Sequence, residues 1–145
     1  MAATLIISLA MPTAPLMAHH TDQKTRKEFK GILPDAYYRG LAKCETRGNW
    51  ARNGHSYTGG LGIYKGTAER WSGKRRIHKL TPREQVEIAD RIAFTGWMNP
   101  NKKVNPFKAA VGPWGWGCLK QSKYLQGFIC RSRHELVQRW KRNCA

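Results

Sequence analysis

Residues 42–50 read AKCETRGNW and connect a predicted helix to a polar loop. Before this stretch, apolar residues recur at spacings of three and four, which predicts a helix over residues 35–46. Glu45 therefore lies at the end of that helix, beside Cys44 and ahead of a loop rich in Gly, Asn and aromatic residues. A carboxyl group held where a rigid helix meets a polar cleft is suited to act as a general acid.

The scarcity of acidic residues singles out Glu45 as the candidate acid. The sequence has 9 Asp and Glu residues. Most of the others are expected in an N-terminal linker, at helix starts, in a capping box or on a solvated helix face: Asp22, Glu28, Asp35, Glu84, Glu87, Asp90 and Glu135. Glu69, next to Arg70, stays ambiguous. The alternative for Glu45 itself is a helix-end ion pair with Lys43 or Arg47.

The chain is strongly basic. Its 145 residues include 26 Lys and Arg against 9 Asp and Glu, which gives a formal net charge of +17. A positive field of this size favours a polyanionic partner, namely nucleic acid, an anionic membrane or the bacterial cell wall. The length and the 41% hydrophobic content predict one domain with its own core, and they exclude general disorder. Collagen-like and coiled-coil classes are excluded because their repeats are missing.

The N-terminal 20 residues differ from the rest because they contain no Lys, Arg, Asp or Glu. Residues 4–18 are mostly apolar and end in small residues, as a secretory signal does. The basic start of such a signal is missing, so the alternative is an apolar tail. The stretch is too short, and too interrupted by proline, to predict a membrane span. We expect an exported chain without stable membrane insertion, in which residues 21–34 form a basic linker.

Four cysteines, at positions 44, 118, 130 and 144, suggest two disulfides in an exported chain. Four cysteines allow three connectivities, and the spacing alone selects none of them. Zinc binding is the alternative, but the sequence has no C-x-x-C pair. The histidines are scattered without ligand spacing, so neither a metal nor another cofactor is expected.

The central part of the chain is expected to alternate loops and helices. Residues 48–60 predict tight loops with a short hairpin, and residues 66–71 predict a short helix. The strongest helical pattern covers residues 80–97, where Thr81 and Glu84 form a capping box.

The C-terminal part is expected to be irregular at first and to end in a helix. Residues 98–117 are rich in Pro, Gly and Asn, which predicts irregular structure. A last amphipathic helix is predicted over residues 133–142, with Ser132 as its capping residue and Glu135 three residues later.

Several motifs, in order, resemble the catalytic domain of resuscitation-promoting factors. These are lysozyme-like, cell-wall-cleaving proteins of actinobacteria, and related domains occur in phages. In that family a Cys precedes the catalytic Glu and a Gly-Asn-Trp turn follows, a pattern that residues 44–50 repeat. Residues 59–61, 82–85 and 114–118 are similar to later family segments. The resemblance covers residues 35–118 and implies a small lysozyme-like fold, α+β and mainly helical, with a short hairpin or irregular loops beside the cleft.

The resemblance also implies roles for individual residues. Glu45 takes the position of the catalytic general acid, and Cys44 and Cys118 take the positions of the domain's disulfide. Cys130 and Cys144 have no counterpart in the family and are predicted to pair with each other. Six residues are expected to bind substrate. Asn49, Trp50, Tyr57 and Thr67 match positions of the family motifs, and Trp114 and Trp116 lie in a Gly-rich loop.

Three positions depart from the family pattern. Gly62 stands where the family usually has Gln, so an amide that could bond to sugar is missing. Ile63 replaces the usual Phe, and Ala68 replaces the usual Trp. Residues 119–145 lie beyond the family pattern and are expected to form a helical extension.

The activity implied by the resemblance is cleavage of the β-1,4 bond between N-acetylmuramic acid and N-acetylglucosamine in peptidoglycan. Two-carboxylate glycosidases pair an acid with a nucleophile or base. Here the first acidic residue after Glu45 is Glu69, which favours a lytic transglycosylase that leaves a 1,6-anhydro end. Hydrolysis, with Glu45 guiding a water molecule, is the close variant.

The expected partners are peptidoglycan glycan strands and anionic cell-wall polymers. The chain is expected to be a monomer that is secreted or associated with the cell wall. The chain is expected to be a bacterial secreted factor, or a phage-encoded lysin or virion component. Two other functions stay open, namely a non-catalytic wall-binding relative and a basic nucleic-acid-binding protein. The sequence contains no helix-turn-helix, zinc-finger or RNP-like motif, so no specific nucleic acid is expected.

Overall fold

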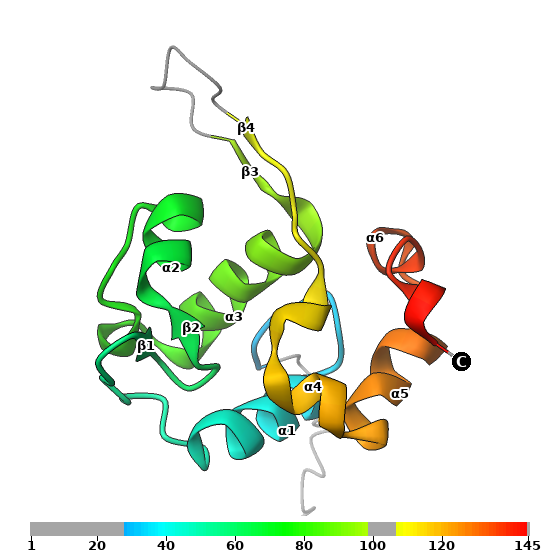
Figure 1. Cartoon of the computed structure of the whole chain (residues 1–145), viewed down its shortest axis with the longest axis horizontal. Coiled ribbons are helices and arrows are strands. Elements are labelled where there is room, and N and C mark those ends of the chain that lie inside the picture. Colours follow the sequence, from blue (N-terminus) through cyan, green and yellow to red (C-terminus); the bar gives the residue numbers. More distant parts are fainter. Residues whose placement is uncertain (1–27, 99–106, 145) are drawn as a thin grey trace, which may run out of the picture.

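The computed structural model describes residues 28–98 and 107–144. These residues are mainly helical, with two short antiparallel strand pairs, and the helices share one core (Figure 1). The mainly helical α+β class expected from the sequence is confirmed. The apolar N-terminal segment and the first part of the predicted linker lie outside the described residues. No helix in the two described ranges is long and apolar enough to cross a membrane.

The elements follow one another along the chain in this order: α1 (Asp35–Thr46), β1 (Tyr57–Thr58), β2 (Ile63–Tyr64), α2 (Lys65–Ser72), η1 (Ile77–Lys79), α3 (Pro82–Asp90), η2 (Arg91–Thr95), β3 (Trp97–Met98), β4 (Phe107–Lys108), η3 (Pro113–Gly115), α4 (Gly117–Gln121), α5 (Lys123–Arg131), α6 (Glu135–Gln138) and η4 (Lys141–Asn143).

Helix α1 forms where the sequence predicts it and buries one face in the core. Its C-terminal end is fixed in two ways. Arg47 adopts a left-handed backbone conformation with φ of 59°, which ends the helix. The buried hydroxyl of Thr46 donates a hydrogen bond to the carbonyl oxygen of Gly60, 2.7 Å away. Glu45 therefore sits in a helical turn that is tied to the neighbouring loop.

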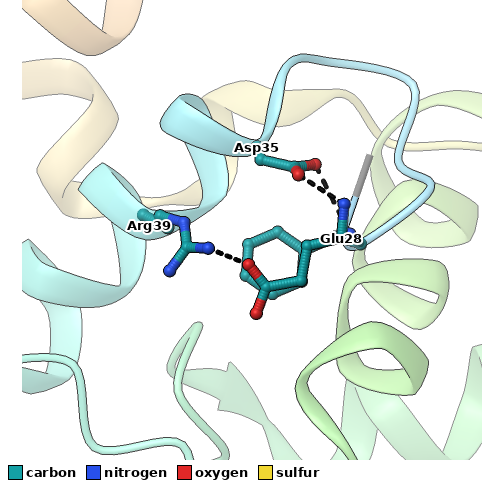
Figure 2. A network of polar contacts seen from close by, with 4 residues as sticks. Glu28, Asp35 and Arg39 are labelled. Atoms are coloured by element: carbon teal, nitrogen blue, oxygen red, sulfur yellow. Dashed lines mark hydrogen bonds and ion pairs between the residues drawn. The ribbon is translucent and has the colours of Figure 1, made fainter. Parts of the chain in front are cut away.

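The segment before α1 belongs to the fold. The backbone N–H groups of Glu28 and Phe29 donate to the Asp35 carboxylate over 2.5 and 3.4 Å (Figure 2). Figure 2 also shows the ion pair between Glu28 and Arg39. The side chains of Phe29 and Leu33 are buried in the core. The linker predicted from the basic composition is therefore wrong for residues 28–33, because Phe29 and Leu33 are buried inside the domain and Ile32 packs against its core.

A buried glutamine on α3 holds the loop that follows α1. Gln85 accepts a hydrogen bond from the Gly60 N–H over 2.8 Å and donates to the carbonyls of Trp50 and Leu80 over 3.0 and 2.9 Å. A Cβ atom at Gly59 would lie 2.4 Å from the amide oxygen of Gln85, so only glycine fits there. These bonds fix the Gly-Gly turn and orient the hairpin that begins beside it.

The hairpin predicted within residues 48–60 is confirmed in part, because an isolated antiparallel bridge joins Asn53 and Thr58, and the paired strands lie slightly later in the chain. Strands β1 and β2 pair antiparallel, with Tyr57 opposite Tyr64 and Thr58 opposite Ile63. The helix predicted over residues 66–71 is confirmed as α2, which begins directly after β2.

Helix α3 has the predicted capping box. The Thr81 hydroxyl accepts from the Glu84 N–H, and the Glu84 carboxylate accepts from the Thr81 N–H. The helix predicted over residues 80–97 is nevertheless shorter, because α3 passes into the π-helical turn η2 after Asp90. Turns of this kind often lie at functional sites, and here the turn contributes a wall of the cavity described below.

Asp90 was expected on a solvated helix face, and this expectation is wrong. Its carboxylate is buried and accepts hydrogen bonds from the Ile32 N–H over 2.9 Å and from the Tyr38 hydroxyl over 2.6 Å. Burial, together with the negative charge of Asp90, raises the pKa of Tyr38 well above its ordinary value. The phenol therefore stays protonated and continues to donate to Asp90.

The C-terminal part is more helical than predicted. Within residues 98–117, β3 and β4 pair antiparallel before the turn η3. Helices α4 and α5 then follow, in agreement with the helical extension expected for residues 119–145, although no periodic pattern located these two helices. The helix predicted over residues 133–142 is reduced to α6, and His134 replaces the expected Ser132 as its capping residue.

The C-terminal helices do not form a separate unit. Leu119, Leu125, Ile129 and Val137 are buried in the same cluster as α1 and α3. Figure 1 shows α4 and α5 lying alongside α1. Residues 119–144 therefore extend the core that α1 and α3 form.

Candidate active site

A cavity of about 460 Å³ opens between α1, the hairpin, α2 and the segment around η3. It combines a carboxyl group with aromatic, aliphatic and glycine residues. The residues that line it are Glu45, Tyr57, Gly62, Ile63, Tyr64, Thr67, Ile92, Val111, Gly112, Gly115, Trp116 and Gly117. A concave, mostly apolar site with a few convergent polar groups is the usual form of a small-ligand or oligosaccharide site.

The carboxyl group of Glu45 is oriented by the backbone of a distant segment. Its Oε1 atom accepts a hydrogen bond from the Cys118 N–H over 3.0 Å. Its Oε2 atom lies 3.4 Å from the position that a Cβ atom would take at Gly62, another residue of the cavity wall. One oxygen is thus held by the backbone, and the other lies beside the open space at Gly62.

Glu45 forms no ion pair within the residues that the structure describes. The alternative prediction, a helix-end pair with Lys43 or Arg47, is therefore not observed. Thr67, near the start of α2, is another polar residue of the cavity wall.

Both disulfides have the predicted pairing. Cys44 is bonded to Cys118, and Cys130 is bonded to Cys144. The first bridge has a direct link to the site. Cys44 precedes Glu45 in the chain, and the backbone N–H of Cys118 donates a hydrogen bond to the Glu45 carboxyl group. The bridge therefore holds donor and acceptor together across a sequence separation of 74 residues.

The other acidic side chains of the described ranges have structural roles away from the cavity. Glu69 pairs with Arg75, and Glu87 pairs with Arg91. Four more make the ion pair and hydrogen bonds described above, namely Glu28, Asp35, Glu84 and Asp90. Glu135 lies in the first turn of α6. Among the described residues that line the cavity, Glu45 carries the one carboxyl group.

Burial also shapes the surroundings of α1. Burial raises the pKa of Tyr37 well above its ordinary value, and the nearby charges of Asp90 and Glu45 act in the same direction. The phenol is therefore neutral at any working pH and acts as part of the core beneath the helix.

The structure brings together half of the residues predicted to bind substrate. Tyr57, Thr67 and Trp116 line the cavity. The Trp116 ring is fixed there because its Nε1–H donates to the carbonyl of Leu61 over 2.7 Å. These three residues come from the hairpin, from α2 and from the segment before α4, so the fold brings distant parts of the chain together at Glu45.

The other predicted binding residues have structural contacts outside the cavity lining. The Trp50 ring packs on Gly60, where a Cβ atom would lie 2.6 Å from it. Trp114 is half-buried, donates its Nε1–H to the carbonyl of Trp140 over 2.9 Å and does not line the cavity with Trp116. Asn49 is exposed, and its side chain accepts a hydrogen bond from the Ala51 N–H.

Several residues of the cavity wall were missed. Ile92 and Val111 come together because the Val111 N–H donates to the Ile92 carbonyl over 2.8 Å, a contact that depends on the π-helical turn. Tyr64 was missed although a signal existed. A hairpin centred after Gly60 places it opposite Tyr57.

No group of three or more potential metal ligands occurs in residues 28–98 or 107–144.

No family model matches the chain. Part of it is similar to resuscitation-promoting factor Rpf1 of Corynebacterium glutamicum, with 36% identity over 69 residues, which covers 44% of this chain and 36% of the relative. Resuscitation-promoting factor RpfD of Mycobacterium tuberculosis is 39% identical over 56 residues, which covers 38% of this chain and 36% of the relative. The chain thus spans about a third of the length of these curated relatives, and over that part it is similar to actinobacterial resuscitation-promoting factors.

Proposed function

We propose that the chain is a lysozyme-like enzyme that cleaves peptidoglycan, with Glu45 as its general acid and base. One observation carries the proposal, namely that Glu45 provides the one carboxyl group among the described residues that line an open cavity of aromatic and small residues. The partial similarity to resuscitation-promoting factors supports the same substrate. The proposed bond is the β-1,4 linkage between N-acetylmuramic acid and N-acetylglucosamine.

The single carboxyl group favours lytic transglycosylation. Glycosidases with two carboxylates hold them roughly 5–9.5 Å apart across the scissile bond. In the proposed reaction the Glu45 carboxyl group gives its proton to the leaving O4 oxygen as the C1–O4 bond breaks. The C6 hydroxyl of the same muramic acid then bonds to C1 and returns its proton to Glu45. The product carries a 1,6-anhydro ring, and no water is consumed. Hydrolysis would replace that hydroxyl with water.

The surroundings of Glu45 suit this role. The Cys118 N–H fixes one carboxyl oxygen, so the other has a defined direction. Gly62 leaves space beside that second oxygen, where a leaving group can approach. We assign Thr67 to a hydrogen bond with substrate, and Tyr57 and Trp116 to packing against sugar rings, because all three line the same cavity.

We further propose that the chain acts at the cell wall after secretion. The net charge of +17 would attract it to wall polymers that carry phosphodiesters and carboxylates. This placement rests on the charge and on the partial relatives, and the activity of those whole proteins is part of the proposal.

The test is a comparison of Glu45→Gln with the unchanged chain on purified bacterial walls. Glu45→Gln keeps the size and an oxygen acceptor for the Cys118 N–H but cannot donate a proton from a carboxyl group. We expect wall solubilisation to fall by at least about 100-fold, the usual contribution of a general acid. Glu69→Gln, an exposed carboxylate outside the cavity, is the matched control and should keep full activity. Undiminished lysis by Glu45→Gln would overturn the assignment, and walls bound but never solubilised by the unchanged chain would favour a non-catalytic binder.

A further inference from the structure

Exposed apolar side chains gather at the cavity. Four large hydrophobic side chains are more than half exposed in the described ranges: Tyr57 at 57%, Tyr64 at 52%, Val111 at 57% and Tyr124 at 62%. The first three line the cavity, and Tyr124 lies on α5. Single exposed apolar residues are common on protein surfaces, but several at the rim of one cavity indicate a surface used for binding.

Tyr64 is held in place at this rim by its neighbours. It pairs across the hairpin with Tyr57, and the two ring centroids lie 5.8 Å apart with 62° between the ring planes. Gly66 leaves room for the ring, because a Cβ atom there would lie 2.8 Å from Tyr64 Cε1. The edge-on contact with Tyr57 and the small residue beside it limit where the Tyr64 ring can move, while half of its surface stays open to solvent.

The chemistry of the Tyr64 side chain fits a sugar. Tyr64 and Tyr57 are both more than half exposed, so part of each ring stays open to a ligand. A pyranose ring has an apolar face of C–H groups and a rim of hydroxyl and amide groups. The tyrosine ring offers the matching apolar face, while its polar tip keeps the edge of the ring in contact with water.

We propose that Tyr64 is a sugar-binding residue, which packs its ring against a pyranose of an N-acetylated β-1,4 glycan at the rim of the cavity that contains Glu45. The inference rests on the proposed function for the identity of the glycan. In this account Tyr57 holds the Tyr64 ring from the side, and Thr67, on the helix that begins after Tyr64, contacts the same chain of sugars deeper in the cavity.

The test measures binding without cleavage. A tetramer of β-1,4-linked N-acetylglucosamine is titrated into the Glu45→Gln chain by calorimetry, with and without a second substitution. We expect Tyr64→Ala to weaken the Kd about fivefold or more, as truncation of a well-packed aromatic contact commonly does. Tyr64→Phe keeps the ring and should bind within about twofold of the parent. The matched control is Tyr124→Ala, an equally exposed tyrosine outside the cavity, which should leave the Kd unchanged.

Further variants separate binding from hairpin stability. Tyr64→Leu keeps an apolar side chain in the hairpin but has no flat ring, so it should fold and still bind as weakly as Tyr64→Ala. Parent-like binding by a folded Tyr64→Ala or Tyr64→Leu chain would overturn the inference and leave the proposed function standing. An equal loss in Tyr64→Phe would assign the effect to the hydroxyl and overturn ring packing. Failure of the parent to bind the tetramer would also overturn the inference, whereas the wall-lysis assay decides the proposed function separately.

Discussion

At the scale of single residues, the site depends on Glu45 and Gly62, which both line the cavity. The carboxyl group has a backbone donor on one side and a residue without a side chain on the other. Gly62 has φ of 60°, so its backbone also favours glycine. The glycine that departs from the family's usual Gln therefore has a physical role here, because it gives a tight turn and keeps space open next to Glu45.

Substitution of Gly62 should affect stability and activity together. In Gly62→Ala, the left-handed backbone is expected to cost about 1–2 kcal/mol of unfolding free energy. The new methyl group would lie 3.4 Å from Glu45 Oε2 and occupy space proposed for the leaving group. We expect both a lower Tm and a lower kcat/KM on soluble glycan fragments.

Gly73→Ala is the matched control for this prediction. Gly73 has φ of 70° and open space around its Cβ position, so the substitution brings the same backbone strain without crowding the acid. The control should lose comparable stability and keep its kcat/KM at temperatures where it is folded. Equal activity in the two folded variants would show that the space beside Glu45 has no part in the reaction.

Individual residues also show the limit of inference from sequence. Glu45 was found because acids are few and its local motif is specific. Trp50 was assigned to the substrate because it matches an aromatic residue of the resembling family, and Trp114 because it lies in a Gly-rich loop. Their contacts with Gly60 and with the Trp140 carbonyl depend on parts of the chain that no local pattern identifies. Asp90 was misassigned for the same reason, because its partners come from the segment around Ile32.

At the scale of elements, the Cys44–Cys118 bridge joins the end of α1 to the start of α4. Loop-entropy estimates give about 4 kcal/mol for a bridge of this span. The double variant Cys44→Ser/Cys118→Ser should lose about that much unfolding free energy. It should also lose wall-cleaving activity while still folded, because the Cys118 N–H is no longer held against Glu45. Chemical denaturation and the lysis assay measure the two effects.

The second bridge provides the control for the first. Cys130–Cys144 closes a loop with a separation of 14 residues in the C-terminal part. Its double Ser variant should lose about 3 kcal/mol of stability. It should keep its activity at a temperature where circular dichroism shows both variants folded. If the two variants lost activity equally under those conditions, the special role of the first bridge would be refuted.

The capping box of α3 predicts a dependence of stability on pH. Hydrogen bonds from the Thr81 backbone and hydroxyl lower the pKa of Glu84 below its ordinary value. Because the folded-state pKa is the lower one, the unfolded chain takes up the proton first. The stabilisation is then present above the unfolded pKa and is lost as pH falls through the folded one.

The measurement is thermal unfolding of the unchanged chain and of Glu84→Gln across a pH series. At neutral pH the unchanged chain should have the higher Tm, and the difference should shrink as the pH falls below about 4. A difference that stays constant over the acidic range would contradict the role of the ionised carboxylate in the cap.

Elements with local signals could be predicted, and elements that depend on tertiary contacts could not. Helix α1 and the α3 capping box follow from periodicity and from capping residues. Helix α5 has Gly127 in its middle and a buried side that includes Leu125 and Ile129, which is stable only against the rest of the core. The π-helical turn gives no periodic signal, so the sequence did not predict that its residue Ile92 lines the cavity.

At the scale of the whole molecule, the excess of positive charge predicts how the chain meets its substrate. Exposed charges are screened beyond about 8 Å at physiological salt, so adsorption by a diffuse positive field should weaken as salt rises. We expect adsorption of the Glu45→Gln chain to walls to fall steadily with added salt, and to be weaker on walls stripped of phosphodiester polymers. Pelleting assays measure both. Adsorption that is insensitive to both changes would mean that the net charge does not drive wall binding.

The most direct test of the account is mass spectrometry of the products released from purified peptidoglycan. The unchanged chain should release soluble muropeptides that end in 1,6-anhydro-N-acetylmuramic acid, and the folded Glu45→Gln variant should release none above background. Reducing ends without the anhydro ring would favour hydrolysis over transglycosylation. Release of the same fragments by both proteins, or by neither, would contradict the central claim that Glu45 cleaves the glycan strand.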